Sequence, residues 1–368
     1  MRVWIEIDAD HLKANLDKIR GLCGKREIIA VVKSNCYGLG AVEMVRKLSE
    51  FGVRVFAVAN YEEGLELVQS GVKAEILVLG AMFEDEIKAA VARGFHVSVN
   101  TMDELRFIRE NKLPAKIQLK VDTGMGRVGF VPGEFQTAWD YCVEAGLDVT
   151  GVYSHLSSAD VMTREAHSHT LRQIALFREL SRGKDVRYSH IFNSGGIVRY
   201  SKVIEGNAVR PGICMYGMLG NEKITGFKSV FAMKGRVIYK RSVSERTYIS
   251  YSRTAYVEPG DTFATISVGY EDGLRRDFSN KTDILIKGVK CPVVGNITMD
   301  MTMVKLPPEI AQKVGVGEEA TVYTDELIGD IKSPSACSWE IMTGIGRRVY
   351  RVYYEGGKPY KTVKWISE

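Results

Sequence analysis

Eight short apolar runs rich in β-branched residues recur through the first 210 residues, and each is followed by a stretch with helical spacing. The runs lie at 28–32, 55–59, 76–79, 96–99, 117–121, 149–154, 189–192 and 208–210. The helix-like stretches lie at 41–51, 61–70, 84–93, 102–111, 134–145 and 163–182. Eight strands alternating with helices over about 200 residues is the count of a closed (β/α)8 or TIM barrel. We therefore predict an α/β fold with such a barrel over residues 8–225, because a doubly wound sheet would need fewer strands or a visible domain break.

The pattern changes after about residue 225, where strand-like segments are separated by Gly, Pro and Asp turns. These segments lie at 230–239, 262–268, 283–286, 289–294, 301–306 and 320–323, with a single short helix-like stretch at 339–345. A chain of 368 residues also exceeds the usual size of one domain. We predict a second, mostly β domain over residues 226–368, joined by a first strand within residues 1–7 that pairs with it.

Charge and cysteine content exclude several classes of protein. The net charge of +5 is spread along the chain without a block of Lys and Arg, which argues against nucleic acid as a partner. The longest nearly apolar stretch, 76–83, is too short to cross a bilayer, and the acidic N-terminal segment lacks a signal-peptide pattern. Six cysteines are scattered without a CxxC pair, so we expect reduced thiols and no metal site. The sequence thus predicts a cytoplasmic protein with neither a membrane nor a nucleic-acid partner.

Polar residues follow several of the predicted barrel strands, at the end of the barrel where functional groups lie. Lys33 follows the first run, although a lysine there is also an ordinary solvated strand end. Lys120 lies on the fifth run, and the next loop sets Arg127 among three glycines that let a backbone approach a ligand. His155 follows the sixth run, where a lone histidine is either structural or functional.

Small residues with free backbone N–H groups follow the last two barrel strands. The segments Asn193-Ser194-Gly195-Gly196 and Arg210-Pro211-Gly212-Ile213 match the phosphate site that many such barrels share. A strand-end lysine, a phosphate cradle and two arginines suit a Schiff base with an aldehyde cofactor that carries a phosphate. The sequence therefore predicts pyridoxal 5'-phosphate as the cofactor.

Two motifs resemble those of the alanine racemase family. Residues 30–40 (AVVKSNCYGLG) resemble the family's cofactor-lysine motif, and residues 120–127 (KVDTGMGR) resemble its second signature. Further similar segments occur in order along the whole chain, at 155, 193–194, 209–213, 215–217, 250–251, 269–273 and 299–300.

This resemblance implies a racemase that interconverts L- and D-alanine, a peptidoglycan precursor, through an external aldimine. Lys33 and Tyr251 would be the two catalytic bases, with Tyr251 reaching into the partner's barrel in a homodimer. Residues implied to bind the cofactor are Lys33, Tyr37, His155, Asn193, Ser194, Arg210, Gly212 and Ile213. Residues implied to bind the substrate are Arg127, Met299 and Tyr270, and Lys120 matches a lysine that is often carbamylated.

Two positions depart from the family pattern. Arg347 stands where typical members have a tyrosine that touches the cofactor phosphate, so we expect Arg347 to bind the cofactor. Asn296 stands where many members have an arginine at the entrance to the site. Because both changes bear on the substrate pocket, a racemase of broader specificity, acting on serine, lysine or other amino acids, remains an alternative. A decarboxylase with the same cofactor and a non-catalytic cofactor-binding protein are further alternatives.

Overall fold

The computed structural model describes residues 1–219, 222–333 and 336–364. Its internal contacts divide the chain into two compact units. One unit consists of residues 16–215, and the other combines residues 1–15 with residues 216–368. We call them the barrel unit and the sheet unit.

The barrel unit contains eight strands in the order β8-β7-β6-β5-β4-β3-β2-β9, and all neighbours in this order are parallel. The strands are β2 (Glu27–Val31), β3 (Val55–Val58), β4 (Glu75–Val78), β5 (His96–Val99), β6 (Lys116–Lys120), β7 (Val149–Tyr153), β8 (Tyr188–His190) and β9 (Ala208–Val209). Backbone bonds from Asn207 N to Ser189 O (2.9 Å) and from Arg210 N to Phe192 O (2.8 Å) link the last two strands. The predicted barrel is therefore confirmed, and each predicted run coincides with one strand.

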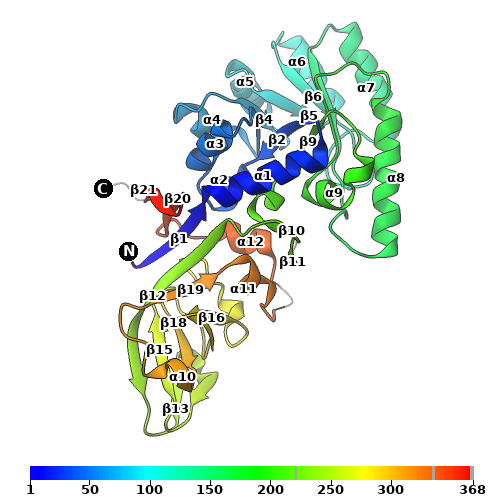
Figure 1. The fold of residues 1–368 in the computed structure, drawn as a ribbon. Helices are drawn as coiled ribbons and strands as arrows, with labels where there is room; N and C mark the ends of the chain where they lie inside the picture. The colour runs from blue at the N-terminus through cyan, green and yellow to red at the C-terminus, as the bar shows by residue number, and fades with distance from the viewer. Residues whose placement is uncertain (220–221, 334–335, 365–368) are drawn as a thin grey trace. The chain divides into compact units, whose positions relative to one another are not determined.

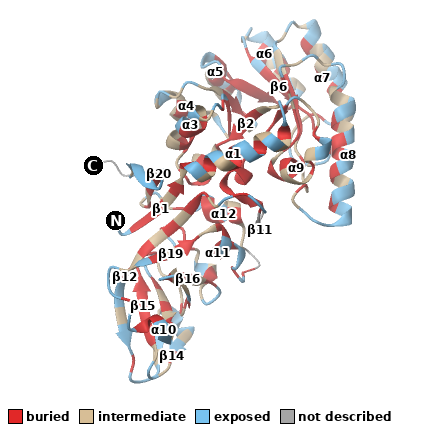
Figure 2. Cartoon of the chain, in the orientation of Figure 1, coloured by how far each residue is buried: buried red, intermediate tan, exposed pale blue. Residues whose placement is uncertain are grey.

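Helices surround these strands (Figure 1). They are α3 (Ala41–Glu50), α4 (Tyr61–Gln69), α5 (Glu84–Ala92), α6 (Met102–Glu110), α7 (Pro132–Glu144), α8 (Arg164–Ser181) and the short α9 (Ser194–Arg199). The strands are buried, whereas the outer faces of the helices are exposed, as Figure 2 shows. Asn60 caps α4 by accepting a bond from Glu63 N (3.0 Å), and Thr101 and Glu104 form the predicted capping box of α6. The sequence interpretation missed α1 (Ala9–Cys23), which crosses the division between the units.

The sheet unit is built on a nine-stranded sheet with the main order β17-β16-β19-β12-β1-β20-β21, in which β15 joins β12 to β18. Its strands are β1 (Val3–Asp8), β12 (Phe231–Ser242), β15 (Thr262–Ile266), β16 (Asp283–Ile286), β17 (Val289–Pro292), β18 (Thr302–Leu306), β19 (Glu319–Tyr323), β20 (Tyr350–Glu355) and β21 (Lys358–Val363). The predicted first strand does pair here, because β1 runs antiparallel to β12 and parallel to β20. Two small pairs, β10 (Met218–Leu219) with β11 (Glu222–Lys223) and β13 (Thr247–Ile249) with β14 (Ala255–Val257), complete the strands.

The expectation of one short helix in this unit was wrong. The predicted helix is α12 (Ser338–Thr343), and two others precede it, α10 (Pro308–Ala311) and α11 (Asp325–Gly329). Each has a local start signal, since Pro308 occupies the first turn of α10 and Thr324 caps α11 by accepting a bond from Leu327 N (3.1 Å). Four single 3-10 turns also occur within the described residues: η1 (Ser201–Val203) in the barrel unit, η2 (Ile213–Tyr216) across the division, and η3 (Tyr251–Arg253) and η4 (Arg276–Phe278) in the sheet unit.

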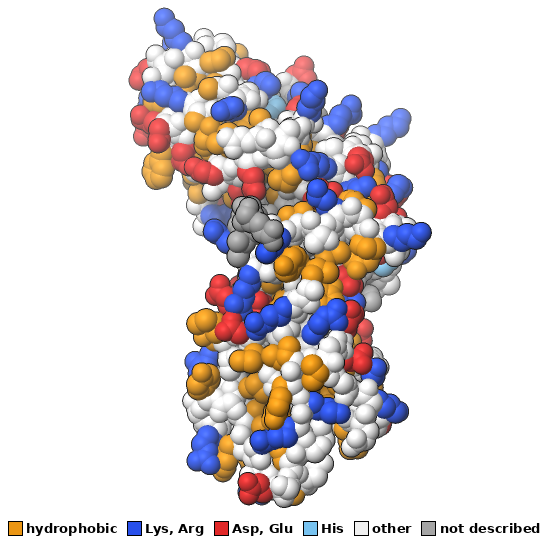
Figure 3. Space-filling model, turned by 90° about the vertical axis from the view of Figure 1, so that its left-hand side faces the viewer, with side chains coloured by type: hydrophobic (Ala, Val, Ile, Leu, Met, Phe, Trp, Pro, Cys, Tyr) orange, Lys and Arg blue, Asp and Glu red, His pale blue; other side chains and the backbone are white. Residues whose placement is uncertain are grey.

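No helix in the described ranges is long and apolar enough to cross a membrane. The six cysteines, all within the described residues, are not joined by disulfides. On the face drawn in Figure 3, lysine and arginine side chains are spread among acidic, apolar and neutral ones and form no continuous stripe.

Candidate active site

A left-handed turn follows β2 and carries the first candidate residues. Ser34, Asn35, Cys36 and Tyr37 have φ values of 54°, 52°, 53° and 54°, although none is glycine. This conformation costs about 1–2 kcal/mol per residue, so the surroundings must hold it. Backbone bonds from Cys36 N to Val32 O (2.8 Å) and from Gly38 N to Ser34 O (2.9 Å) close the turn. The Asn35 side chain ties it to α3 by accepting a bond from Ala41 N (2.8 Å).

The turn determines where Lys33 and Tyr37 lie. Lys33 is half-buried, and burial together with the nearby Arg127 lowers the pKa of its amine, while Glu63 opposes this effect. Tyr37 is buried beside Gly212, so closely that a Cβ on Gly212 would lie 2.5 Å from the Tyr37 hydroxyl oxygen. The first and last barrel strands therefore present Lys33, Tyr37 and Gly212 at one end of the barrel.

A chain of buried hydrogen bonds runs from Arg210 to His155 and His190. Arg210 Nη1 donates to His190 Nδ1, and Arg210 Nη2 lies 3.2 Å from His155 Nδ1 and donates to Ser154 O (2.6 Å). Because a guanidinium can only donate, His190 Nδ1 accepts, and His190 Nε2 donates to Gln118 Oε1 (2.8 Å). The Tyr153 ring stacks on His190 with centroids 5.0 Å apart. The network thus fixes the orientation of the Arg210 guanidinium.

Both histidines are neutral in this environment. Burial, followed by the positive charge of Arg210, holds the pKa of His155 and of His190 well below 6.5. Arg210 Nη2 can only donate, so His155 Nδ1 accepts from it, and His155 Nε2 lies 3.3 Å from the side-chain amide of Asn193. Burial also lowers the pKa of Arg210 to about 10, so its guanidinium remains charged at neutral pH.

The segments after β8 and β9 meet through Ser194. Its hydroxyl oxygen accepts bonds from Gly212 N (3.0 Å) and from Cys214 N (3.3 Å), next to Ile213. Asn193 caps α9 by accepting a bond from Gly196 N (3.1 Å), and its amide donates to Leu156 O (2.9 Å). The two segments predicted to bind phosphate are therefore brought together. The space between them admits only backbone and small side chains.

The loop after β6 is folded around Asp122. Its carboxylate accepts bonds from Gly124 N (2.9 Å), Met125 N (2.7 Å) and Arg127 N (3.0 Å). Burial alone would raise the pKa of Asp122, but these N–H groups outweigh it and lower that pKa. Lys120 is 3% exposed and donates to Val128 O, and burial, with Arg210 and Arg127 nearby, lowers its pKa to about 8 although Asp122 opposes the shift.

In the sheet unit, Tyr251 stands on a tightly held turn. Its side chain is 71% exposed, yet Ser250 and Ser252 on either side have left-handed φ values of 64° and 61°. Asn296 holds this backbone, because its amide donates to Tyr251 O (2.9 Å) and its own carbonyl accepts from Ser250 Oγ (2.5 Å). Asn296, which departs from the family pattern, thus contacts the turn that carries the second predicted base.

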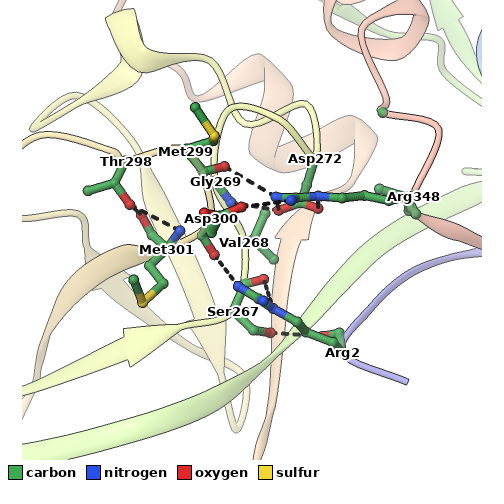
Figure 4. A network of polar contacts seen from close by, with 12 residues as sticks. Arg2, Ser267, Val268, Gly269, Asp272, Thr298, Met299, Asp300, Met301 and Arg348 are labelled. Atoms are coloured by element: carbon green, nitrogen blue, oxygen red, sulfur yellow. Dashed lines mark hydrogen bonds and ion pairs between the residues drawn. The ribbon is translucent and has the colours of Figure 1, made fainter.

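Two loops of the sheet unit, which carry Gly269 and Met299 in Figure 4, pack against each other, and Tyr270 directly follows Gly269. Tyr270 N donates to Thr298 O (3.0 Å), and a Cβ on Gly269 would lie only 2.3 Å from Met299 O. Arg348 ties both loops to the segment after α12, through two bonds to Asp272 (2.7 and 3.1 Å) and one ion pair with Asp300 (2.7 Å). Asp272 is almost fully buried, so this contact fixes where the exposed Tyr270 and Met299 side chains lie.

Comparison with known proteins agrees with this arrangement. Residues 7–220 match the family model for the N-terminal domain of alanine racemases, and residues 230–353 match the model for their C-terminal domain. The chain belongs to the alanine racemase family. It is 41% identical to an alanine racemase of Fusobacterium nucleatum over 96% of this chain and 99% of that protein. It is also 33% identical to an alanine racemase of Clostridium novyi over 99% of this chain and 98% of the relative.

Solved alanine racemases have the same fold as this family member. The enzyme of Clostridium difficile 630 superposes with a TM-score of 0.89 at 27% identity, covering 100% of this chain and 99% of that one. The Bacillus anthracis enzyme with bound L-Ala-P gives a TM-score of 0.86 at 26% identity, covering 99% and 98%.

Arg347, which the sequence predicts to depart from the family pattern, is exposed in the sheet unit. It directly precedes Arg348, the residue that bonds to Asp272.

The sequence interpretation missed two residues that bear on the site, Glu63 and Tyr153. Glu63 is the third residue of α4, where a carboxylate signals a helix start and nothing further. Tyr153 lies within the predicted run 149–154, and only the pairing of β6 and β7 reveals its place beside Lys120.

Proposed function

We propose that this protein interconverts L- and D-alanine with pyridoxal phosphate bound at the end of the barrel. The observation that carries the proposal is Lys33, which a strained turn holds at the barrel mouth and whose amine has a pKa below its ordinary value because of burial and the nearby Arg127. Membership of the alanine racemase family, shown over both domains, supports the same reaction. The protein is then an isomerase.

The charges at the barrel mouth fit an anionic cofactor. The positive charge of Arg127 contributes to the lowered pKa of Lys33, Lys120 and Arg210, and Arg210 contributes to the lowered pKa of Lys120. Within the described ranges none of the four makes an ion pair with a carboxylate. The carboxylates of Glu63 and Asp122 act on Lys33 and Lys120 without forming ion pairs. The four basic side chains outnumber these two carboxylates, and the excess of positive charge favours a ligand that carries a phosphate and a phenolate.

Each residue has a defined role toward that cofactor. Ser194, Gly212, Ile213 and Tyr37 would hold the phosphate, and the close approach of Gly212 to Tyr37 leaves no space for a larger residue there. His155, supported by Asn193, would pack against the ring, and Arg210 would donate to the ring nitrogen. Arg127 would hold the substrate carboxylate. Arg347 would add a charged contact to the phosphate.

Racemisation needs one base on each face of the substrate α-carbon, because the proton leaves one face and another returns on the opposite face. Pyridoxal phosphate, when bound, supplies an electron-poor ring that stabilises the charge left on that carbon. Lys33 takes or returns the proton on one face, and burial favours the neutral amine that this requires. Tyr251 serves the other face.

Tyr251 acts across a cytoplasmic homodimer in this proposal. A tyrosine that is 71% exposed while its backbone is held in a left-handed turn by Asn296 is suited to enter another subunit's site. Tyr270 and Met299, also exposed, would line the substrate side of the partner's barrel. Six cysteines without a disulfide among them are compatible with a reducing compartment.

Lys120 is carbamylated in this proposal. With a pKa of about 8, a sizeable fraction of its amine is neutral near pH 7.5 and can attack CO2. A bond forms between Nζ and the carbon, one proton leaves to solvent, and the resulting anion can orient Arg127. Val99 pairs with Leu119, so the next residues of the two strands, Asn100 and Lys120, follow the same pair. Asn100 is 6% exposed, and neither polar atom of its side-chain amide has a hydrogen-bond partner. The Asn100 amide is therefore available to bind such an anion.

A broader substrate range is the second candidate function, and Arg347 is the observation that favours it. An arginine in place of the usual tyrosine changes the size and charge of the pocket edge. A decarboxylase that depends on a cysteine is disfavoured, because burial raises the pKa of the Cys291 thiol to about 12.

The test is to incubate the purified protein and cofactor with L-alanine, and with other L-amino acids, and to measure the D-isomer and CO2. D-alanine without CO2 is expected. Lys33→Ala and Tyr251→Phe should each abolish nearly all activity. Mixing these two variants should restore part of it, since one site of the heterodimer then holds both bases. If subunits exchange and no activity returns, the shared-site assignment is wrong.

A further inference from the structure

We propose that Glu63 is a positioning residue for Lys33, because its carboxylate clamps the peptide that follows the lysine to the neighbouring barrel strand. The inference rests on the proposed function, in which Lys33 is a base and Tyr37 contacts the cofactor. Nothing in the family resemblance assigns Glu63 a role.

The clamp consists of two hydrogen bonds to one carboxylate. Glu63 Oε1 accepts from Ser34 N (2.7 Å), and Glu63 Oε2 accepts from Ala59 N (2.8 Å). Ser34 directly follows Lys33, and Ala59 directly follows β3, which pairs with β2. One side chain thus joins the ends of two adjacent strands at the barrel mouth.

The lysine is fixed from both sides as a result. Val32 N donates to Ala57 O (2.9 Å) before Lys33, and Ser34 N donates to Glu63 after it. Ser34 is also the first of the four left-handed residues that lead to Tyr37. Because the same turn carries Lys33 and Tyr37, release of its first peptide is expected to displace both side chains.

A carboxylate is the group that this geometry requires. Two N–H donors from different strands need two acceptor oxygens, and a glutamine side chain offers one oxygen and one NH2 group. An aspartate has both oxygens, but it is one methylene shorter and cannot reach both donors from the same helix position. Asn60, which caps α4 at Glu63 N (3.0 Å), fixes the start of the helix from which Glu63 extends.

Glu63 also contributes charge to the site. The charged and titratable groups that face Lys33 are Glu63 on α4, Arg127 after β6 and His155 after β7, and Glu66 lies one helical turn from Glu63. Burial and Arg127 lower the pKa of Lys33, whereas Glu63 raises it. Removing the negative charge should therefore make the lysine amine less basic.

The experiment compares Glu63→Gln, Glu63→Asp and, as a matched control, Glu62→Gln on the exposed neighbouring position. The first readout is the pH dependence of Lys33 acetylation in the full-length protein freed of cofactor, followed by mass spectrometry with the exposed Lys88 as internal reference. The second readout is the dissociation constant of pyridoxal phosphate. Neither readout depends on turnover, so a failure of the racemase assay is distinguishable from a failure of this assignment.

Glu63→Gln is expected to lower the acetylation midpoint of Lys33 by about 0.5 pH unit or more and to weaken cofactor binding about ten-fold. Glu63→Asp should keep the midpoint close to that of the unchanged protein, since the charge remains, and should still weaken binding. Glu62→Gln should change neither quantity. The assignment is overturned if Glu63→Gln behaves like Glu62→Gln. It is also overturned if binding weakens while the midpoint stays fixed, because a general loosening of the fold would give that result.

Discussion

The contact between Gly212 and Tyr37 gives the sharpest prediction about the cofactor cradle. In Gly212→Ala the new Cβ would lie 2.5 Å from the Tyr37 hydroxyl oxygen, whereas ordinary contact begins near 3.4 Å. The hydroxyl must therefore move by about 0.9 Å, the difference between these two distances. Tyr37 is buried and belongs to the left-handed turn, so it cannot move alone. Overpacking of this kind costs about 1–3 kcal/mol.

The loss should be visible as weaker cofactor binding. We expect the dissociation constant of pyridoxal phosphate to rise about 5- to 150-fold in Gly212→Ala, measured by absorbance titration of the cofactor-free protein. Gly133→Ala is the matched control, because a Cβ at Gly133 meets nothing within 4 Å.

A double-mutant cycle separates this contact from other effects. Without the hydroxyl, in Tyr37→Phe, the nearest atom to the new Cβ is the ring carbon Cζ at 3.3 Å, which requires only a slight adjustment. Gly212→Ala should then cost less than about three-fold in the Tyr37→Phe background. An equal loss in both backgrounds would refute the reasoning, because the hydroxyl contact would not be its cause.

Three further predictions concern the histidines, Arg347 and Lys120. Since His155 and His190 have folded-state pKa values well below 6.5, the unfolded chain gains protons first, so the thermal unfolding midpoint should fall as pH drops below about 6.5; a pH-independent midpoint from pH 8 to 5 would contradict this. Arg347→Ala should weaken cofactor binding about ten-fold, and Arg347→Tyr should do so less; unchanged binding in both variants with a large change in the alanine-to-serine rate ratio would place Arg347 in the substrate pocket. Protein prepared with ¹³C-labelled CO2 should give a carbamate NMR signal that Lys120→Ala lacks, and the same signal in that variant would assign the modification elsewhere.

The barrel could be predicted because its strands are buried on both faces and read as continuous apolar runs. α1 also has a sequence pattern, which the prediction missed: the apolar residues Leu12, Leu16 and Ile19 recur at helical spacing, and they are fully buried. β20 and β21 fell outside the predicted segments. β21 is mostly exposed and has no apolar alternation, whereas β20 is largely buried and was simply missed.

The sequence could indicate candidate residues for the site, but not the contacts that hold them in position. Lys33, Lys120, His155 and Arg210 could be named as candidates because strand ends and motifs mark them. The left-handed turn at 34–37 contains no glycine, so the sequence does not indicate it. Tertiary contacts, such as the hydrogen bond from Ser34 N to Glu63, hold the turn in place. The Arg348 contacts with Asp272 and Asp300 join positions that lie far apart in sequence, so no local pattern could indicate them.

The place of β1 in the sheet unit has a consequence for synthesis of the chain. This strand lies between β12 and β20, and β20 begins at Tyr350, about 340 residues after β1 ends. The sheet unit therefore cannot complete its central hydrogen bonding until the residues of β20 have been made. The barrel strands, in contrast, mostly pair with their nearest neighbours in sequence and can assemble progressively. The apolar residues of β1 lack their β20 partner during this interval, so steric crowding around β1 should slow folding of the sheet unit without contacting the site.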